Sequence, residues 1–455
     1  MKKKFFIPLL CLIMTASVTS LSAQQAITKA QFPYDITKTI VKEYIFPSTV
    51  SYVETKGVHY FAFADASMNV FYQEFDKNIF VQDFKIFKEF VYFCGYDKTN
   101  GCQGVWGYFK VLDLKTSNAP YNTYSSFNCS KHTVDTLHSI VVYSIQSSIN
   151  IVTVGTTTDG GSVKNGCTIH ITPSTSGIYN WDYTIGVTPD ATDERIKYLC
   201  ETDNLIVSAG SSSLFSDMET YRVHKKSDIF SVTGQQDDIW YFAYSTAYPY
   251  LRNTDKFAIT HTMGDNMAMA FQSKKILPSP TDCILLYEYD MSTLTNGTSS
   301  TLNPLAVSTS TYPFEVEGLV YSSNSNSLSL LMTGYIPFSP LNGYGSIVAE
   351  ITPGTTYANL HGLKDIELHS IDNYNYKQNF VCLGANMNDR KNATFYTQPL
   401  NTSINCTDNA YIFGVDPIFL TKMHTYPYTL CSDSFNCNQK KGGNLEQTPN
   451  NVICQ

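Results

Sequence analysis

One strand, loop and strand pattern recurs along the whole sequence, and this recurrence limits the chain to a repeat architecture. In its clearest copy, residues 88–114, an apolar strand ends at Gly95 and, after a polar loop, an aromatic and β-branched strand begins at Val105. Looser copies of the first strand are VHYFAFA (58–64), NIVTVG (150–155), LIVSAG (205–210), MAMAFQ (267–272), LSLLMTG (328–334) and FVCLG (380–384). Such repetition predicts a radial or solenoid fold.

The spacing of the copies predicts the number of strands in each unit. The strand-ending glycines after Gly95 are Gly155, Gly210, Gly334 and Gly384. A period of roughly 55 residues fits a four-stranded blade with generous loops. We therefore predict an all-β fold, a seven-bladed β-propeller of mostly four-stranded blades. Two tandem β-sandwiches are the alternative, but they do not require the same hairpin seven times.

The hairpin VYFCG…GVWGYF (91–109) and its copies resemble the seven-bladed β-propellers of exported proteins from gut Bacteroidetes, a group without an assigned activity. The resemblance covers roughly residues 36–400. It implies the fold and supplies no functional residues, because a fold alone does not imply a function.

The first residues predict export. A positive end (2–4), an apolar run (5–18) and small residues before a cleavage site after Ala23 are typical of a secretory signal peptide. Cys11 lies within the apolar run and follows Leu10, which argues against a lipid anchor. No later stretch of about 20 residues is apolar enough to span a bilayer. The expected segments are a signal peptide (1–23), a β-propeller (24–400) and a Cys-rich tail (401–455) in a monomer that is secreted, periplasmic or at the cell surface.

The charge of the chain argues against nucleic acid as a partner. The net charge is −8 at pH 7 and becomes −11 when cleavage removes the three lysines of the signal peptide. No basic run follows. Only 15% of residues are charged and 14% are aromatic, which is typical of a strand-rich protein.

Cysteine spacing predicts disulfides rather than zinc. Cys94 and Cys102 flank the loop of the clearest hairpin, and a bridge between them would close a short loop. We expect the tail cysteines to staple the tail; they are Cys406, Cys431, Cys437 and Cys454. Zinc is disfavoured here, because these spacings contain no CxxC pair and His424 is the one histidine nearby.

Residues 37–47 read as a strand without a hairpin partner. A closed ring of blades needs one terminal strand to complete the blade at the other end of the chain, because exposed sheet edges aggregate. We therefore predict that residues 37–47 pair with the last blade.

Acidic residues stand at or near the start of six first strands: Asp83, Asp135, Glu194, Asp255, Glu315 and Asp365. If they point toward the propeller axis, they form a negative mouth that could bind Ca²⁺. The other interpretation, which we favour, is that they bind backbone N–H groups in the connecting turns.

An aromatic loop is predicted at residues 237–253. Its candidate binding residues are Trp240, Tyr241, Tyr244, Tyr248, Tyr250 and Arg252. Such residues stack on sugars or bury part of a protein partner. An outer strand followed by a packed loop explains the same pattern equally well.

Signals for catalysis are weak. His138, His261 and His369 lie in first strands, but at three, six and four residues after their acidic residues, so strand alternation predicts that they do not share one inward level. No hydrolase, zinc-protease or nucleotide-binding motif is present. We predict no catalytic residues, no metal site and no cofactor other than Ca²⁺. The expected function is an exported binding module for a glycan or a protein. The alternatives are a hydrolase or lyase acting on polysaccharide, and a structural subunit of a surface assembly.

Overall fold

The computed structural model describes strands and turns between residues 27 and 453, and the predicted all-β class is confirmed. The description leaves out 46, 100–102, 117–119, 126–127, 130–131, 146, 159–163, 174–177, 186–193, 213–217, 227–235, 244–256, 276–280, 293–300, 303–304, 309–313, 337–342, 353–356, 375–377, 400–406, 415–417, 428, 437, 442–444 and 448–449. The predicted signal peptide also lies outside it. In the part described, no helix has the length and apolar character needed to cross a membrane.

Among the described residues, most strands pair in seven four-stranded antiparallel units, which the outermost strands join into six sheets; the units are numbered in chain order. Unit 1 contains β2 (Ile36–Glu43), β3 (Thr49–Thr55), β4 (His59–Ala64) and β5 (Val70–Phe75). Unit 2 contains β6 (Ile79–Phe87), β7 (Phe90–Asp97), β8 (Gln103–Lys110) and β9 (Pro120–Ser125), with the 3₁₀ helix η1 (Val111–Lys115) before β9. Unit 3 contains β11 (His132–Ile145), β12 (Ser148–Thr158), β13 (Lys164–Pro173) and β14 (Ile178–Ile185), with β10 (Asn128–Cys129) beside β11. Unit 4 contains β15 (Glu194–Glu201), β16 (Leu205–Ser212), β17 (Met218–Lys225) and β18 (Gln236–Ala243).

The last three units follow the same order. Unit 5 contains β19 (Phe257–His261), β20 (Asn266–Lys275), β21 (Thr281–Asp290) and β23 (Leu305–Ser308), with β22 (Thr301–Leu302) outside it. Unit 6 contains β24 (Phe314–Ser322), β25 (Ser327–Ile336), β26 (Gly343–Ile351) and β27 (Tyr357–Lys364). Unit 7 contains β28 (Ile366–Asn373), β29 (Gln378–Asn386), β30 (Asn392–Pro399) and the N-terminal strand β1 (Ile27–Gln31).

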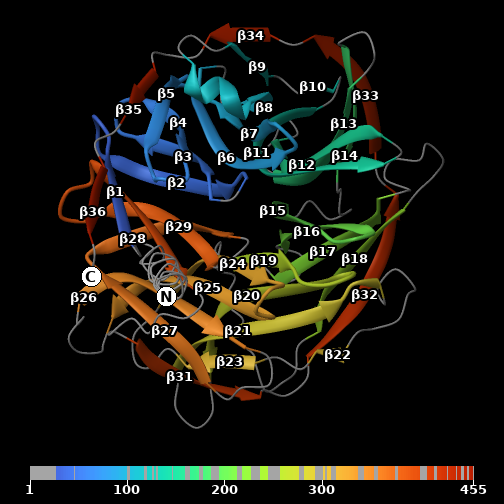
Figure 1. The fold of residues 1–455 in the computed structure, drawn as a ribbon. Helices are drawn as coiled ribbons and strands as arrows, with labels where there is room; N and C mark the ends of the chain where they lie inside the picture. The colour runs from blue at the N-terminus through green and yellow to red at the C-terminus, as the bar shows by residue number, and fades with distance from the viewer. Residues whose placement is uncertain are drawn as a thin grey trace, which may run out of the picture.

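The first strands of the units lie toward the middle of the molecule and the later strands lie outward (Figure 1). The first strand of each unit contacts the first strand of the next, from β2 through β6, β11, β15, β19 and β24 to β28. β28 in turn contacts β2. Strands far apart in the sequence therefore meet in the middle, where their side chains can form one site.

The N-terminal strand that pairs with unit 7 is not the predicted one. β1 pairs with β30, from Ile27 opposite Tyr396 to Gln31 opposite Asn392. The prediction for residues 37–47 is wrong, because β2 occupies that segment and pairs with β3 in its own unit. The partner is β3, which begins at Thr49, directly after the turn that follows β2.

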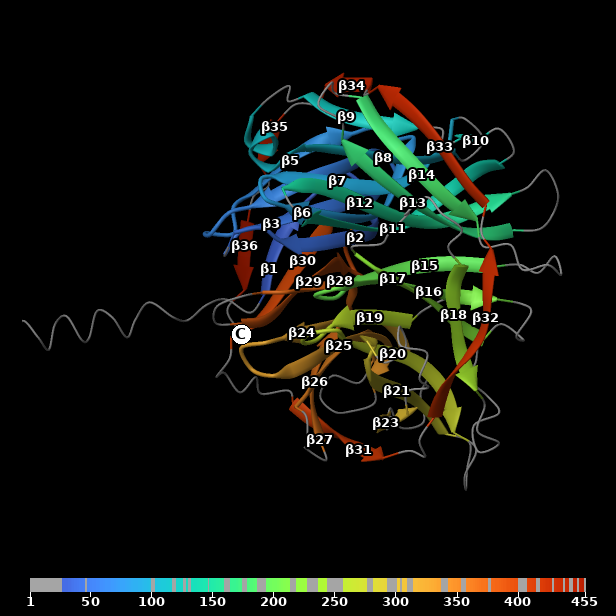
Figure 2. The same cartoon turned by 90° about the vertical axis from the view of Figure 1, so that its right-hand side faces the viewer.

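The C-terminal residues form a belt of short strands on the outside of the units (Figure 2). The belt strands are β31 (Thr407–Gly414), β32 (Ile418–Pro427), β33 (Thr429–Asn436), β34 (Asn438–Lys441), β35 (Leu445–Gln447) and β36 (Asn450–Ile453). β31 pairs with β23 and β27 and so joins units 5 and 6 in one nine-stranded sheet. From β32 to β36, the belt then pairs in turn with β18, β14, β9, β5 and β1. It therefore covers outer edges that would otherwise be exposed.

The apolar core lies between consecutive units, because both faces of most sheets are buried. In β4, Phe61 and Phe63 pack with Phe93 of unit 2, whereas Tyr60 and Ala62 pack with residues of unit 7. Successive side chains of a strand point to opposite faces, so β4 contributes to two clusters. Each buried Phe stabilises the fold by about 1.5–3 kcal/mol, which fixes each unit against its neighbours.

The predicted Cys94–Cys102 disulfide is wrong, because Cys94 is a free, buried thiol. In the hairpin of β7 and β8, Asp97 lies opposite Gln103, so Cys94 lies three pairs further along, opposite Trp106. Its side chain packs with Trp106 in an apolar cluster. Cys102 itself lies outside the described residues.

The predicted stapling of the tail stays a prediction. Cys406, Cys437 and Cys454 lie outside the described residues. The backbone of Cys431 lies in β33, opposite Tyr183 of unit 3. The described free cysteines are all buried; they are Cys94, Cys167, Cys200 and Cys382.

Candidate functional site

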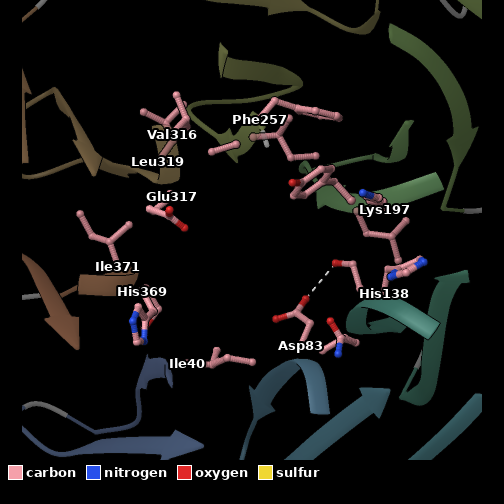
Figure 3. A pocket seen from close by; sticks show the side chains of 18 of the residues that line it. Ile40, Asp83, His138, Lys197, Phe257, Val316, Glu317, Leu319, His369 and Ile371 are labelled. Carbon is pink, nitrogen blue, oxygen red and sulfur yellow. Dashed lines mark hydrogen bonds between the residues drawn. The ribbon is translucent and has the colours of Figure 1, made fainter. Parts of the chain in front are cut away.

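A central cavity of about 380 Å³ lies between the first strands of all seven units. Its ionisable side chains are Lys38, Lys42, Asp83, His138, Lys197, Glu317 and His369. Figure 3 shows Asp83 and Glu317 extending into it from different sides. The wall also holds two aromatic rings, Tyr198 and Phe257. A mixed polar and aromatic wall of this kind is typical of a ligand pocket.

β-bulges turn polar residues of the first strands toward this cavity. Six of the seven first strands shift register against the second strand, and β19 is the exception. The extra residue of a bulge breaks the alternation of faces and re-aims its side chain. Five of these extra residues line the cavity: Gln82, His138, Lys197, Glu317 and His369.

The recurring strand-ending glycines make room for these bulges. Gly95 lies opposite Val81, the residue before the bulge of β6. A Cβ atom at Gly95 would lie 1.9 Å from the carbonyl oxygen of Phe80, and one at Gly384 would lie 2.0 Å from that of Glu367. Since no real Cβ approaches so closely, glycine is required at both positions. Four of the five repeat glycines, Gly95, Gly155, Gly210 and Gly384, thus lie opposite the residue before a bulge, whereas Gly334 does not.

Asp83 is held in place by three backbone and hydroxyl donors. Its Oδ2 accepts hydrogen bonds from Ser139 Oγ (2.8 Å) and the backbone N–H of Ile140 (3.3 Å), both on β11. Its Oδ1 accepts one from the N–H of Phe84 (2.9 Å). A carboxylate offers about four acceptor positions, so Asp83 links units 2 and 3 and still has capacity for a ligand.

Two lysines of β2 are tied to the neighbouring units. Lys38 Nζ donates to the carbonyl oxygen of Val81 and to Gln82 Oε1, both at 3.2 Å. Burial lowers the pKa of Lys38 below its usual value. Lys42 Nζ lies 3.9 Å from Asp372 Oδ1. Burial opposes its charge, but attraction to nearby carboxylates, led by Asp372, outweighs burial and raises the pKa of Lys42.

His369 is supported by an ion pair behind the cavity wall. Its Nε2 lies 3.8 Å from Glu367 Oε2, which also accepts a hydrogen bond from Arg390 Nη2 at 2.8 Å. The nearby His369 ring, together with the charge and hydrogen bond of Arg390, lowers the pKa of Glu367 to about 2. Glu367 therefore stays ionised at neutral pH and fixes the orientation of His369.

We expect Glu367→Gln to lower stability in a pH-dependent way. Because the pKa falls from 4.5 to about 2 on folding, the carboxylate stabilises the protein fully above pH 4.5, and this contribution disappears as the pH falls through 2. Solvent screening limits the loss at neutral pH to about 1 kcal/mol. Urea denaturation at several pH values measures it, with the exposed Glu315→Gln as the control. A difference from wild type that does not shrink in acid would contradict this account.

The predicted acidic residues are mostly not at the cavity. Asp83 alone lines it among those whose side chains are described. Asp135 is half-buried on β11 outside the lining, Glu315 is exposed on β24, and Asp365 lies in the turn before β28 with φ +60°. The side chains of Glu194 and Asp255 are outside the description. Within the described part of the chain, no three His, Cys, Asp or Glu side chains are grouped to bind a metal ion. The described residues therefore provide no set of ligands for the Ca²⁺ that the sequence suggests.

Two of the three histidines line the cavity. His138 and His369 lie on opposite sides of it in Figure 3, and that the histidines do not share one inward level stays a prediction. Each is the extra residue of a bulge, which breaks the alternation used for that prediction. His261 lies elsewhere, at the end of β19, where its Nε2 is 2.8 Å from the carbonyl oxygen of Gly264.

The predicted aromatic loop begins with a strand. Trp240 and Tyr241 lie on β18, which pairs with β17 on one edge and with belt strand β32 on the other. Nothing is described of their side chains. The remaining candidates lie outside the described residues: Tyr244, Tyr248, Tyr250 and Arg252. A binding role for these residues stays a prediction.

The chain matches no protein-family model, no curated protein and no solved structure.

Proposed function

We propose that the chain is an exported seven-bladed β-propeller that acts as a binding module for a glycan or a protein. The seven four-stranded units, the contact of β28 with β2 and the completion of unit 7 by β1 support the propeller. In such a fold the first strands line the axis. The central cavity is then the axial pocket, and the signal peptide at residues 1–23 exports the protein.

The observation that carries this function is the composition of the central cavity wall. Every unit contributes at least one residue to it, and bulges supply five of its polar side chains. Bulges are common beside functional sites because they re-aim a side chain. Asp83 also holds two units together. A wall with these groups can bind a ligand through hydrogen bonds and ring contacts, and binding requires no chemical step.

A glycan-array screen of residues 24–455, with a parallel screen for protein partners, tests the function, and two variants then locate the site. In the cavity variant, Lys197→Met is combined with Glu317→Gln. In the loop variant, Trp240→Ala, Tyr248→Ala and Arg252→Ala are combined. We expect the cavity variant to lose binding about tenfold or more, because two polar contacts are removed, and the loop variant to keep it. The reverse result would assign the site to the aromatic residues.

One observation favours a polysaccharide hydrolase or lyase as the second candidate. Asp83 and Glu317 come from β6 and β24 and reach the same cavity (Figure 3), and paired carboxylates catalyse glycoside hydrolysis. Prolonged incubation with any bound polysaccharide distinguishes the two functions. New reducing ends that disappear in Asp83→Asn would establish the enzyme, whereas an intact polymer supports the binding module.

A structural subunit is the third candidate, and it requires a large apolar patch. The exposed large apolar side chains of the described residues come from turns, strands and the 3₁₀ helix η1; they are Tyr34, Ile45, Leu112, Met263, Tyr335 and Tyr344. Only Tyr335 and Tyr344 among them are paired across strands. Their dispersal gives no support for an assembly surface.

A further inference from the structure

The charges around the central cavity cancel. The charged side chains that line it are Lys38, Lys42, Lys197, Asp83 and Glu317, and Asp372 pairs with Lys42 at 3.9 Å, which makes three ammonium groups and three carboxylates; behind His369, Glu367 and Arg390 pair with each other and add no net charge. With the histidines neutral, their formal sum is zero. A ligand with a net charge would thus bring an uncompensated charge into a partly dehydrated site, which is costly. The wall therefore favours an uncharged ligand.

Hydrogen-bond donors and acceptors occur on both sides of the cavity. Figure 3 shows Asp83, His138 and Lys197 on one side and Glu317 with His369 on the other. Glu317 Oε1 accepts a hydrogen bond from Thr333 Oγ1 at 3.0 Å, which holds its carboxylate on the cavity wall. A hydroxyl group both donates and accepts. A ligand with several hydroxyl groups can therefore bond to both sides.

An aromatic wall completes the cavity. The rings of Tyr198 on β15 and Phe257 on β19 have centroids 4.2 Å apart, and both line the cavity. An aromatic ring offers a flat apolar surface, which suits the C–H face of a sugar ring. The volume of about 380 Å³ lies near the lower end for ligand pockets, so the space fits one or two rings and not a folded polymer.

From the charge balance, the two-sided donors and acceptors, and the aromatic wall, we infer that the central cavity binds an uncharged sugar ring, such as the terminal residue of a neutral glycan. The ring packs against Tyr198 and Phe257, and its hydroxyl groups bond to Asp83, Glu317 and Lys197. The inference rests on the proposed binding function and names its ligand class.

Calorimetry with matched sugars tests the inference. The mature protein is titrated with methyl hexopyranosides of the gluco, galacto and manno series and with the corresponding uronic acids, which differ in one carboxylate. We expect at least one neutral sugar to bind about tenfold more tightly than its acid. Glu317→Gln should reduce the ratio of the two affinities, because the cavity then carries an excess positive charge that attracts the uronic acid. Lys197→Met should increase the ratio, because the cavity then carries an excess negative charge. Glu315→Gln, exposed and outside the cavity, is the control and should change neither affinity.

The other outcomes separate the inference from the function on which it rests. Tighter binding of the uronic acid by the wild type would overturn the uncharged ligand. If Glu317→Gln and Glu315→Gln change the sugar affinities equally, the sugar does not bind in the central cavity. A protein partner without any sugar binding would overturn the inference and keep the binding module. Failure to bind any glycan or protein would remove the proposed function itself.

Discussion

Shortening the chain from its C-terminus is expected to remove amide protection from the outer strands one at a time. The belt runs around the units against the chain order, so each truncation uncovers the outer strand of one further unit, and the loss of β32 also uncovers β22. Chains ending at residues 448, 443, 437, 428 and 416 should expose β1, β5, β9, β14 and β18 in that order. Each uncovered strand loses interstrand hydrogen bonds worth about 0.5–1.5 kcal/mol apiece.

Complete removal of the belt, in a chain ending at residue 406, should have the largest effect. It would also divide the nine-stranded sheet into the separate sheets of units 5 and 6, which β31 joins. We expect the midpoint of thermal unfolding to fall by at least about 10 °C and the protein to aggregate through its open edges. Hydrogen exchange with mass spectrometry follows the series. If the first truncation removes protection everywhere, or if the last removes none, the belt does not cover the units separately.

Local patterns predicted the strands of the units well. The strand expected at residues 150–155 lies within β12, Ser148–Thr158, and the strand expected at 205–210 lies within β16. Alternating apolar residues and turn glycines specify such hairpins over short distances, and the partner strand follows within a few residues. The sequence alone therefore predicts a strand when its partner strand lies close by in the chain.

Long-range pairing was beyond the sequence. β1 has five residues and pairs with a strand more than 350 residues later, and Cys431 of the belt lies opposite Tyr183. Short polar strands such as β34 and β35 carry no pattern that specifies which edge they cover. The sequence therefore predicts a Cys-rich tail where the structure has the belt. It also predicts that residues 37–47 complete the last unit, whereas β1 does so.

The sequence predicts Asp83 at the cavity but not its other polar residues. The predicted acidic residues stand at strand starts, and strict alternation of faces argues against the histidines. Bulges shift that alternation by one residue, so Glu317 and His369 reach the cavity while Glu315 stays exposed. The signal that could have located the bulges was present, because the strand-ending glycines lie opposite them in several units.

Gly95→Ala should therefore damage both the fold and the site, although Gly95 is not among the residues that line the cavity. The new Cβ would collide with the backbone oxygen of Phe80, which cannot move without removing the bulge of β6. We expect a loss of about 3 kcal/mol or more and displacement of Asp83, so that any folded fraction binds ligand more weakly. Gly264→Asn is the matched control, because a Cβ at Gly264 meets nothing within 4 Å and asparagine tolerates its φ of +62°. Denaturation and calorimetry of both variants measure the effects, and equal stability of the two would show that the glycine is not needed for the bulge.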